Sequence, residues 1–313
     1  MNSSSKVSIL PIVLAIIFLN SVFCAFRVIN KQGSVYLDAN EVLKLKLVEQ
    51  INKDRIRHGL KPVEYDSLAS KVGDSHCKEM LKNRYSSHWN MKGYKPYHRY
   101  SQAGGDDNIS ENVSFQQHYW SRPGFHIDVY KMMLKSHKDM LNEKPPNDGH
   151  RQNILDPYHT HVGIGLAFDR YNVYMTQEFL DRYVEVDTAF PRKAKLGDKI
   201  TLTGKILNPK HTVSSITIFY EPIPKPMSIK KLKSTYAYGL PNKRHDLFPV
   251  LKDSRRYYVG GGRGDIHIFD DGRFESPIPF FKKLEGIYTV VVRVEDERGK
   301  NIPSTSISIK VKD

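Results

Sequence analysis

The chain has 313 residues, a formal net charge of +14 and only two cysteines, Cys24 and Cys77. Two cysteines cannot build a disulfide scaffold, so the protein must be held together by its hydrophobic cores. The length is typical of two domains of ordinary size.

The first residues have the pattern of an export signal. Lys6 precedes an apolar run from Val7 to Phe23, and small residues follow at Cys24 and Ala25. This order predicts a secretory signal peptide at residues 1–25. Two alternatives stay open: a lipoprotein signal that leaves Cys24 as the lipidated first residue, and an uncleaved anchor. We therefore expect a secreted or cell-envelope protein, extracellular or periplasmic.

Helical periodicity follows, over about residues 38–142. Asp38, with Glu41 three residues later, has the pattern of an N-cap and its capping partner, and Gly59 predicts the end of that helix. Asp66 is expected to cap a second helix.

The apolar period changes from helical to alternating after a third expected helix at 126–142 and a loop at 145–149. Residues 161–168 and 171–179 predict two strands joined by a turn. Helices followed by strands indicate an α+β domain, which we place at residues 34–185.

From Lys199 onward, nearly every segment has the pattern of a strand or a turn. Several short strands in succession, with a hairpin signal at Asp271-Gly272, predict an all-β sandwich at residues 195–313. The linker between the domains is expected at 186–194.

The positive charge is concentrated in the C-terminal part. Between Thr188 and Asp313 there are 24 Lys and Arg against 13 Asp and Glu, so this part carries +11 of the chain's +14. In an exported protein this excess indicates contact with an anionic envelope polymer or a membrane surface, and a merely well-solvated surface gives the same pattern. Nucleic acid is not expected as a partner, because the chain leaves the cytoplasm.

Three short segments carry the candidate chemistry. Their sequences are YSSH, SENV and GHRQNIL, and they contain His88, Glu111 and His150 in that order. Imidazoles and carboxylates brought together in a cleft can bind a metal ion or move a proton. The alternative is a structural hydrogen-bond network. No nucleophile accompanies the set at a recognisable spacing, so the sequence does not predict an enzyme.

These motifs, with the nearby sequences YHR, HRQNILDP and TQEF, resemble the CAP superfamily, the SCP-domain group of cysteine-rich secretory, antigen-five and pathogenesis-related-one proteins. The resemblance covers about Ala39 to Arg182. It implies an exported protein whose N-terminal domain is a three-layer α-β-α sandwich. The disulfides of the eukaryotic members are absent, which favours the bacterial branch.

The resemblance also implies a cleft with two His and two Glu. His88, Glu111 and His150 match three of them, and Glu143 matches the second Glu, although Met140 stands where relatives carry an aromatic residue. Members of the family have been linked to sterol or lipid binding, to divalent metal and to proteolysis. Membership therefore implies no single activity.

The residue types themselves predict a metal site. His88 and His150 are expected to bind one divalent ion, most naturally zinc, with Glu111 and Glu143 as further ligands or as partners of the imidazoles. No other cofactor is expected. His159 and His161 share one face of a predicted strand and form a second candidate chelate, for which an exposed edge pair is the favoured interpretation.

The expected function is an exported binding module. Its cleft takes a divalent metal and a lipid or peptide ligand, and the basic sandwich tethers it to the envelope. One alternative is a metal-dependent, protease-like hydrolase in which Glu111 or Glu143 acts as the catalytic base on a metal-bound water. The other is a structural or adhesive surface protein whose cleft is vestigial.

Overall fold

The structure is a computed structural model that describes residues 26–30, 33–119, 126–187, 189–253, 255–259 and 261–313. The expected signal peptide at residues 1–25, including Cys24, lies outside these ranges. The described chain opens with an antiparallel hairpin of β1 (Phe26–Asn30) and β2 (Gly33–Leu37). None of the helices in these ranges is long and apolar enough to cross a membrane.

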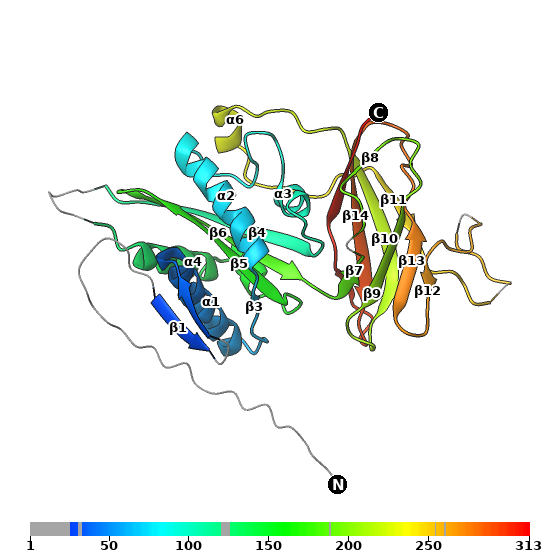
Figure 1. Cartoon of the computed structure of the whole chain (residues 1–313), viewed down its shortest axis with the longest axis horizontal. Helices are drawn as coiled ribbons and strands as arrows, with labels where there is room; N and C mark the ends of the chain where they lie inside the picture. Colours follow the sequence, from blue (N-terminus) through cyan, green and yellow to red (C-terminus); the bar gives the residue numbers. More distant parts are fainter. Residues whose placement is uncertain (1–25, 31–32, 120–125, 188, 254, 260) are drawn as a thin grey trace, which may run out of the picture.

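A four-stranded mixed sheet forms the middle layer of the N-terminal domain (Figure 1). Its strands, in spatial order, are β3 (Glu64–Tyr65), β5 (His161–Phe168), β6 (Asn172–Asp181) and β4 (Asn108–Gln117). Helices α2 (Ser67–Asn83) and α3 (Pro96–Gln102) cover one face. Helices α1 (Ala39–Arg57), α4 (Val129–Leu141) and α5 (Gly149–Ile154) lie on the other. This is the expected three-layer α-β-α sandwich.

The expected helix caps are present, with one correction. Asp38 accepts a hydrogen bond from the Asn40 backbone at the start of α1, and Asp66 accepts one from the Ala69 backbone at the start of α2. Glu41 is not a capping partner: its carboxylate accepts hydrogen bonds from Lys44 Nζ at 2.8 Å and from the Tyr65 hydroxyl at 2.7 Å. Leaving the buried Lys44 ammonium without this carboxylate would cost more free energy than leaving the exposed helix end without a capping partner.

Strand β4 was missed from the sequence, which predicted only helices before residue 142. In its sequence NISENVSFQQ, Ile109, Val113 and Phe115 stand at alternating positions, but the buried Glu111 interrupts the pattern between them. The period-2 signal depends on apolar side chains marking the buried face. A strand that buries a polar site gives only a weak signal.

Glycines allow α2 to lie close against the sheet. A Cβ atom on Gly163 would lie 2.4 Å from the Ser70 backbone nitrogen, and one on Gly165 would lie 2.3 Å from the Gly73 carbonyl carbon. No side chain fits into that space, so the helix and β5 require glycine at this crossing.

Two sheets face each other in the C-terminal part (Figure 1). The larger has the order β11 (Arg244–Leu247), β10 (Thr212–Glu221), β14 (Gly286–Glu295), β16 (Ile307–Val311) and β8 (Lys193–Ala194), with β15 (Asn301–Pro303) beside β14. The smaller has the order β12 (His267–Ile268), β13 (Arg273–Pro277), β9 (Thr201–Ile206) and β7 (Val184–Val186).

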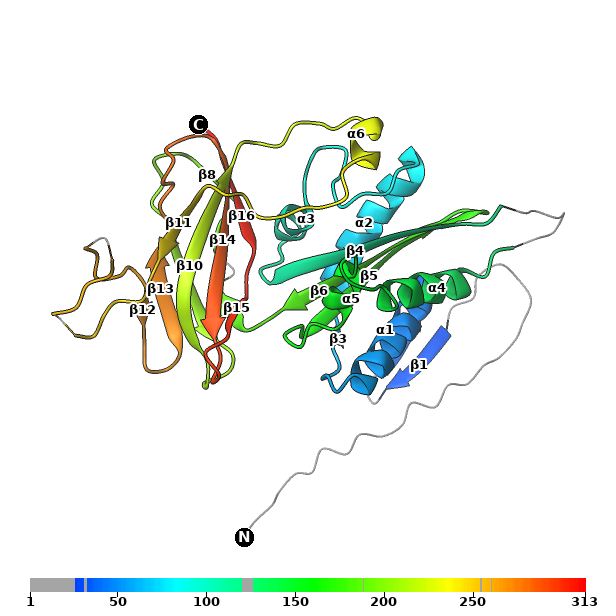
Figure 2. The ribbon, with the colours of Figure 1, turned by 180° about the vertical axis from the view of Figure 1, so that it is seen from behind.

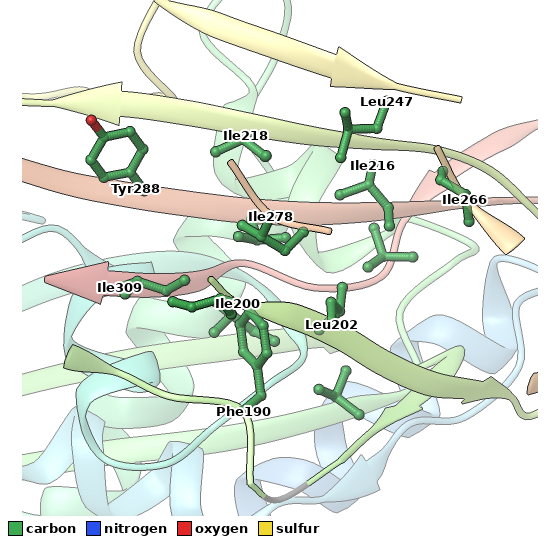
Figure 3. Packing of buried hydrophobic residues seen from close by; sticks show 14 of the residues in the cluster. Phe190, Ile200, Leu202, Ile216, Ile218, Leu247, Ile266, Ile278, Tyr288 and Ile309 are labelled. Atoms are coloured by element: carbon green, nitrogen blue, oxygen red, sulfur yellow. The ribbon is translucent and has the colours of Figure 1, made fainter. Parts of the chain in front are cut away.

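One hydrophobic core fills the space between the two sheets. Leu202 of β9 packs there with Ile216 and Ile218 of β10 and Ile309 of β16 (Figure 3). The C-terminal part is therefore all-β, as expected. The segment expected as a linker, 186–194, contains the end of β7 and all of β8, which pair with strands of these sheets. The division of the chain into two domains at this segment stays a proposal.

The C-terminal sandwich covers the start of β4, the edge strand of the N-terminal sheet. Asp107 forms a β-bridge with Thr305, and the Asn108 backbone donates to the Ser304 carbonyl at 3.1 Å. Ser308 donates through its backbone to the Ser101 hydroxyl at 2.8 Å. An uncovered edge strand is a template for unwanted pairing, so this contact protects it.

Candidate functional site

The four side chains expected in the cleft, His88, Glu111, Glu143 and His150, line one open cleft of about 760 Å³. They come from four places in the fold: the loop after α2, strand β4, the turn after α4 and the first turn of α5. The cleft lies at the β4 edge of the sheet, where these elements meet.

His88 and Glu111 form the more buried pair. His88 Nδ1 lies 2.8 Å from Glu111 Oε1, and the His88 side chain is 13% exposed. Burial, and secondly the Arg99 guanidinium, lower the pKa of His88 to about 4. The ring is therefore neutral near pH 7; its Nδ1–H donates to Glu111, and Nε2 keeps a free lone pair.

Arg99 of α3 fixes this pair from behind. Its guanidinium forms an ion pair with the second oxygen of Glu111 and donates to the His88 carbonyl at 2.6 Å. Because both the carboxylate and the backbone of the His88 loop are held by one cation, the orientation of the imidazole is well defined.

A second buried carboxyl, Glu178, faces Glu111 across the β4–β6 pair. Burial, and then the neighbouring Glu111, raise the pKa of Glu178 well above its usual value. Burial also raises the pKa of Glu111, which Arg99 partly offsets. Two adjacent buried carboxyls cannot both be charged beside one arginine, so the proton resides on Glu178 and Glu111 is the carboxylate.

His150 and Glu143 form the more exposed pair. His150 Nδ1 lies 2.5 Å from Glu143 Oε1, and the His150 backbone donates to the other oxygen at 3.0 Å. Their side chains are 36% and 24% exposed. Helix α4 ends at Leu141 and α5 starts at Gly149, so the short turn between them brings the Glu after one helix to the His at the start of the next.

Several residues of the site were missed by sequence reasoning. Arg99 and Glu178 lie in recognisable motifs, YHR and TQEF, but nothing in the sequence assigned them a role. Tyr238 comes from the C-terminal sandwich, and its hydroxyl accepts a hydrogen bond from the Glu111 backbone at 2.8 Å. Its ring centroid lies 4.8 Å from that of His88. No local signal marks a residue that reaches the cleft from more than a hundred residues away.

His159 and His161 do not form an exposed pair, which corrects the sequence interpretation. His159 is buried, with Nδ1 2.6 Å from Asp181 and Nε2 2.9 Å from the Asn153 side chain. His161 Nε2 accepts from Arg182 at 3.0 Å. With the ring nitrogens of His159 both in use, this pair is a structural hydrogen-bond network.

The cleft does not hold a complete metal shell. Within the described ranges, no group of three or more His, Cys, Asp or Glu side chains is arranged to hold a metal ion. Two imidazole rings line the cleft, each with its Nδ1 on a carboxylate, so their Nε2 atoms are the nitrogens left for a ligand. Such a set leaves the remaining coordination positions to water or a ligand.

Residues 48–179 match the family model of the cysteine-rich secretory protein family, CAP. The N-terminal part of this chain is therefore a CAP domain, to which the C-terminal β sheets are an addition.

Two proteins of Bacillus subtilis are similar in sequence to this chain. The uncharacterized protein YkwD is 26% identical over 121 residues, which are 38% of this chain and 40% of YkwD. The uncharacterized membrane protein YlbC is 27% identical over 139 residues, 44% of this chain and 34% of YlbC. The chain thus spans less than half the length of either relative.

Solved structures with a similar fold include two surface or extracellular proteins. One is an extracellular protein containing an SCP domain from Bacillus anthracis, with 23% identity, a TM-score of 0.37 and coverage of 48% of this chain and 46% of that one. Another is an outer surface protein of Borrelia burgdorferi, with 15% identity, a TM-score of 0.34 and coverage of 51% of this chain and 99% of that one.

Proposed function

We propose that this protein is an exported binding protein whose CAP cleft binds one divalent cation, zinc by preference, through Nε2 of His88 and of His150. The observation that carries the proposal is the pair of carboxylate–imidazole contacts, Glu111 to His88 and Glu143 to His150, which line the same cleft. A carboxylate on Nδ1 fixes the tautomer and makes Nε2 the better metal ligand.

The electrostatics of the cleft favour a cation. Two carboxylates stand behind the imidazoles, and the lowered pKa of His88 keeps its lone pair available at neutral pH. A bound ion would supply a Lewis-acidic centre with open coordination positions.

The geometry favours binding over hydrolysis. The side chain of Glu111 is fully buried, and its two carboxylate oxygens contact His88 and Arg99. It therefore has no free oxygen to act as a base on a substrate. Glu143 uses one oxygen on the His150 ring and the other on the His150 backbone. The hydrolase alternative therefore has no uncommitted carboxylate among its two candidates, Glu111 and Glu143.

Calorimetric titration with zinc tests the proposal. Wild-type protein is expected to bind one ion, and the double variant His88→Ala/His150→Ala is expected to lose at least about tenfold in affinity, because removing metal ligands or their orienting partners has effects of that order. His245→Ala/His267→Ala, which replaces two exposed histidines of the sandwich, is the matched control. Equal affinity in both double variants would place the site elsewhere, and no binding by the wild type would favour the vestigial cleft.

Export is the second part of the proposal. Support comes from the pattern at residues 1–25 and from the extracellular character of the family. Sequencing the mature N-terminus from the native host is expected to start near Ala25 or Phe26, or at a lipid-modified Cys24. Recovery of a cytosolic form that starts at Met1 would contradict export.

The basic sandwich is proposed as the envelope tether. The excess of +11 between Thr188 and Asp313 is accompanied by an exposed segment between β11 and β12, which presents Tyr257 and Val259 next to Arg255, Arg256 and Arg263. Exposed apolar side chains can insert between lipid headgroups, and the neighbouring arginines attract an anionic membrane surface. Retention on anionic liposomes should exceed retention on neutral liposomes and fall with added salt, since such charges are screened within about 8–10 Å. Equal retention at low salt would refute the tether.

A further inference from the structure

The C-terminal sandwich contributes one wall of the CAP cleft. Residues 222–243 leave β10, pass over α2 and α3 through the short helix α6 (Ile229–Lys233), and return to β11; we call this segment the strap (Figure 2). Tyr236, Ala237 and Tyr238 of the strap line the cleft together with His88 and His150.

Hydrogen bonds hold the strap in place along its length. The Ser87 hydroxyl donates to the Thr235 carbonyl at 3.2 Å, and Trp89 Nε1 donates to the Ala237 carbonyl at 3.1 Å. Lys95 Nζ donates to the Gly239 carbonyl at 3.1 Å. Because the carbonyls of Thr235, Ala237 and Gly239, at every second residue, are paired with the CAP domain, the aromatic wall is a built part of the cleft.

The two strap tyrosines have different surroundings. Tyr238 is packed against the His88 ring and accepts a hydrogen bond from the Glu111 backbone, so its position is fixed. Tyr236 is 82% exposed at the rim, so one face of its ring is free for a ligand. An exposed aromatic ring beside a polar cleft indicates a stacking surface.

The remaining lining is polar and carries negative charge. Besides the two imidazoles and the two tyrosines, it consists of carboxylates, amides, a hydroxyl and two small residues: Glu111, Glu143, Asp156, Asn112, Asn147, Gln152, Asn153, Ser110, Gly149 and Ala237. None of these described lining residues is a Lys or an Arg. With no metal ion bound, an anionic ligand would meet three carboxylates and no Lys or Arg in this lining, which disfavours it.

The lining also disfavours acyl chains and peptide side chains. Ala237 is the largest aliphatic side chain among the described residues of the cleft. A lipid tail or an apolar peptide anchor needs a hydrophobic pocket. Sugar hydroxyls, in contrast, both donate and accept, and the side chains of Asn147, Gln152 and Asp156 in the lining offer both roles.

We propose that the composite cleft binds an uncharged saccharide chain, with a sugar ring stacked on Tyr236 and its hydroxyls on Asn147, Gln152 and Asp156 of the CAP side. The inference rests on the proposed function in one respect: both take the CAP cleft as the site where a ligand binds. Saccharide binding at the rim needs no metal ion, so the two proposals can fail separately.

An array of neutral oligosaccharides of hexose and N-acetylhexosamine, probed with the full chain, tests the inference. At least one neutral saccharide should bind, and chains of uronic acid should not. For the bound saccharide, Tyr236→Ala should weaken affinity about tenfold, the order of one aromatic contact, and Tyr236→Trp should keep it. Tyr119→Ala, which removes an equally exposed tyrosine outside the cleft, is the matched control.

Each outcome decides one proposal. Loss in Tyr236→Ala with retention in Tyr236→Trp and Tyr119→Ala supports the saccharide site. No binding on the neutral array, binding of uronic acid chains only, or equal loss in Tyr119→Ala overturns it, as does an affinity for peptides in place of saccharides. Zinc titration of the wild type is measured separately, so zinc binding without saccharide binding refutes this inference alone, and the reverse result refutes the metal proposal alone.

Discussion

At the scale of single residues, the unusual feature is a carboxyl group without a counter-charge. Glu178 is fully buried, and within the described residues neither of its oxygens has a hydrogen-bond partner that meets ordinary geometry. It lies beside Glu111, which already uses the Arg99 guanidinium. Such a group is held protonated because its charged form would be isolated from water.

Glu178 should therefore make stability depend on pH. The pKa of Glu178 in the folded state is raised above the ordinary value of 4.5. The contribution of Glu178 to the free energy of unfolding is therefore complete below pH 4.5 and is lost as the pH rises through the folded-state pKa. The free energy of unfolding of wild-type protein should fall between about pH 5 and about pH 8. Glu178→Gln, which stays neutral, should flatten this dependence and be more stable at the higher pH by about 1 kcal/mol or more.

Urea denaturation at both pH values measures the effect. Glu275→Gln, at an exposed position of β13, is the control and should keep the wild-type profile. If Glu178→Gln retained the wild-type pH dependence in full, Glu178 would not be the group that holds the proton.

At the scale of elements, the position of the cleft depends on how closely α2 lies on the sheet. Gly165 of β5 lies against Gly73 of α2, and Gly163 lies against Ser70, and no space is left for a side chain at either glycine. The His88 loop follows directly from the end of this helix. A shift of α2 away from the sheet would therefore move His88 relative to β4 and Glu111.

Gly165→Ala should destabilise the CAP domain. The added methyl group would lie 2.3 Å from the Gly73 carbonyl carbon, so backbone must move to admit it. We expect a loss of about 1–3 kcal/mol in the free energy of unfolding, as for other overpacked sites. Gly197→Ala, where nothing lies within 4 Å of the added atom, is the control and should change stability little in the same denaturation experiment. An unchanged free energy of unfolding in Gly165→Ala would mean that α2 can move away from the sheet without destabilising the domain.

At the scale of the whole molecule, the two parts of the chain share a polar contact at the base of the strap. Lys95 Nζ lies 2.9 Å from Glu221 at the end of β10, and the Tyr97 hydroxyl donates to the same carboxylate at 3.0 Å. The side chains of Lys95 and Glu221 are 7% and 15% exposed. Removing one partner from a mostly buried pair leaves the other charge without compensation.

Glu221→Gln should therefore loosen the strap and lower the midpoint of thermal unfolding. The expected loss is about 1–3 kcal/mol, below the value for fully buried pairs because Glu221 keeps some contact with solvent. Differential scanning calorimetry measures the change. Glu297→Gln breaks an exposed pair with Lys210 in the same sandwich and should have almost no effect. Equal losses in the two variants would show that the Lys95 contact is no stronger than a surface ion pair.

Local sequence determined a large part of the fold. The caps at Asp38 and Asp66, the strands of the β5–β6 hairpin and the alternating strands of the sandwich follow from short-range patterns, because each depends on neighbours within a few residues. The order of the motifs around His88, Glu111 and His150 was also sufficient to predict the CAP family.

Tertiary structure alone decided the environment of the site. The buried Glu111 interrupts the apolar alternation of β4, so pairing with β6 fixes it as a strand. The proton on Glu178 depends on a neighbour across the sheet. Tyr236 and Tyr238 reach the cleft only because the strap folds back over the CAP domain. Burial and contacts between distant segments have no local signature, and for that reason the sequence predicts the cleft residues but not the wall that completes the cleft.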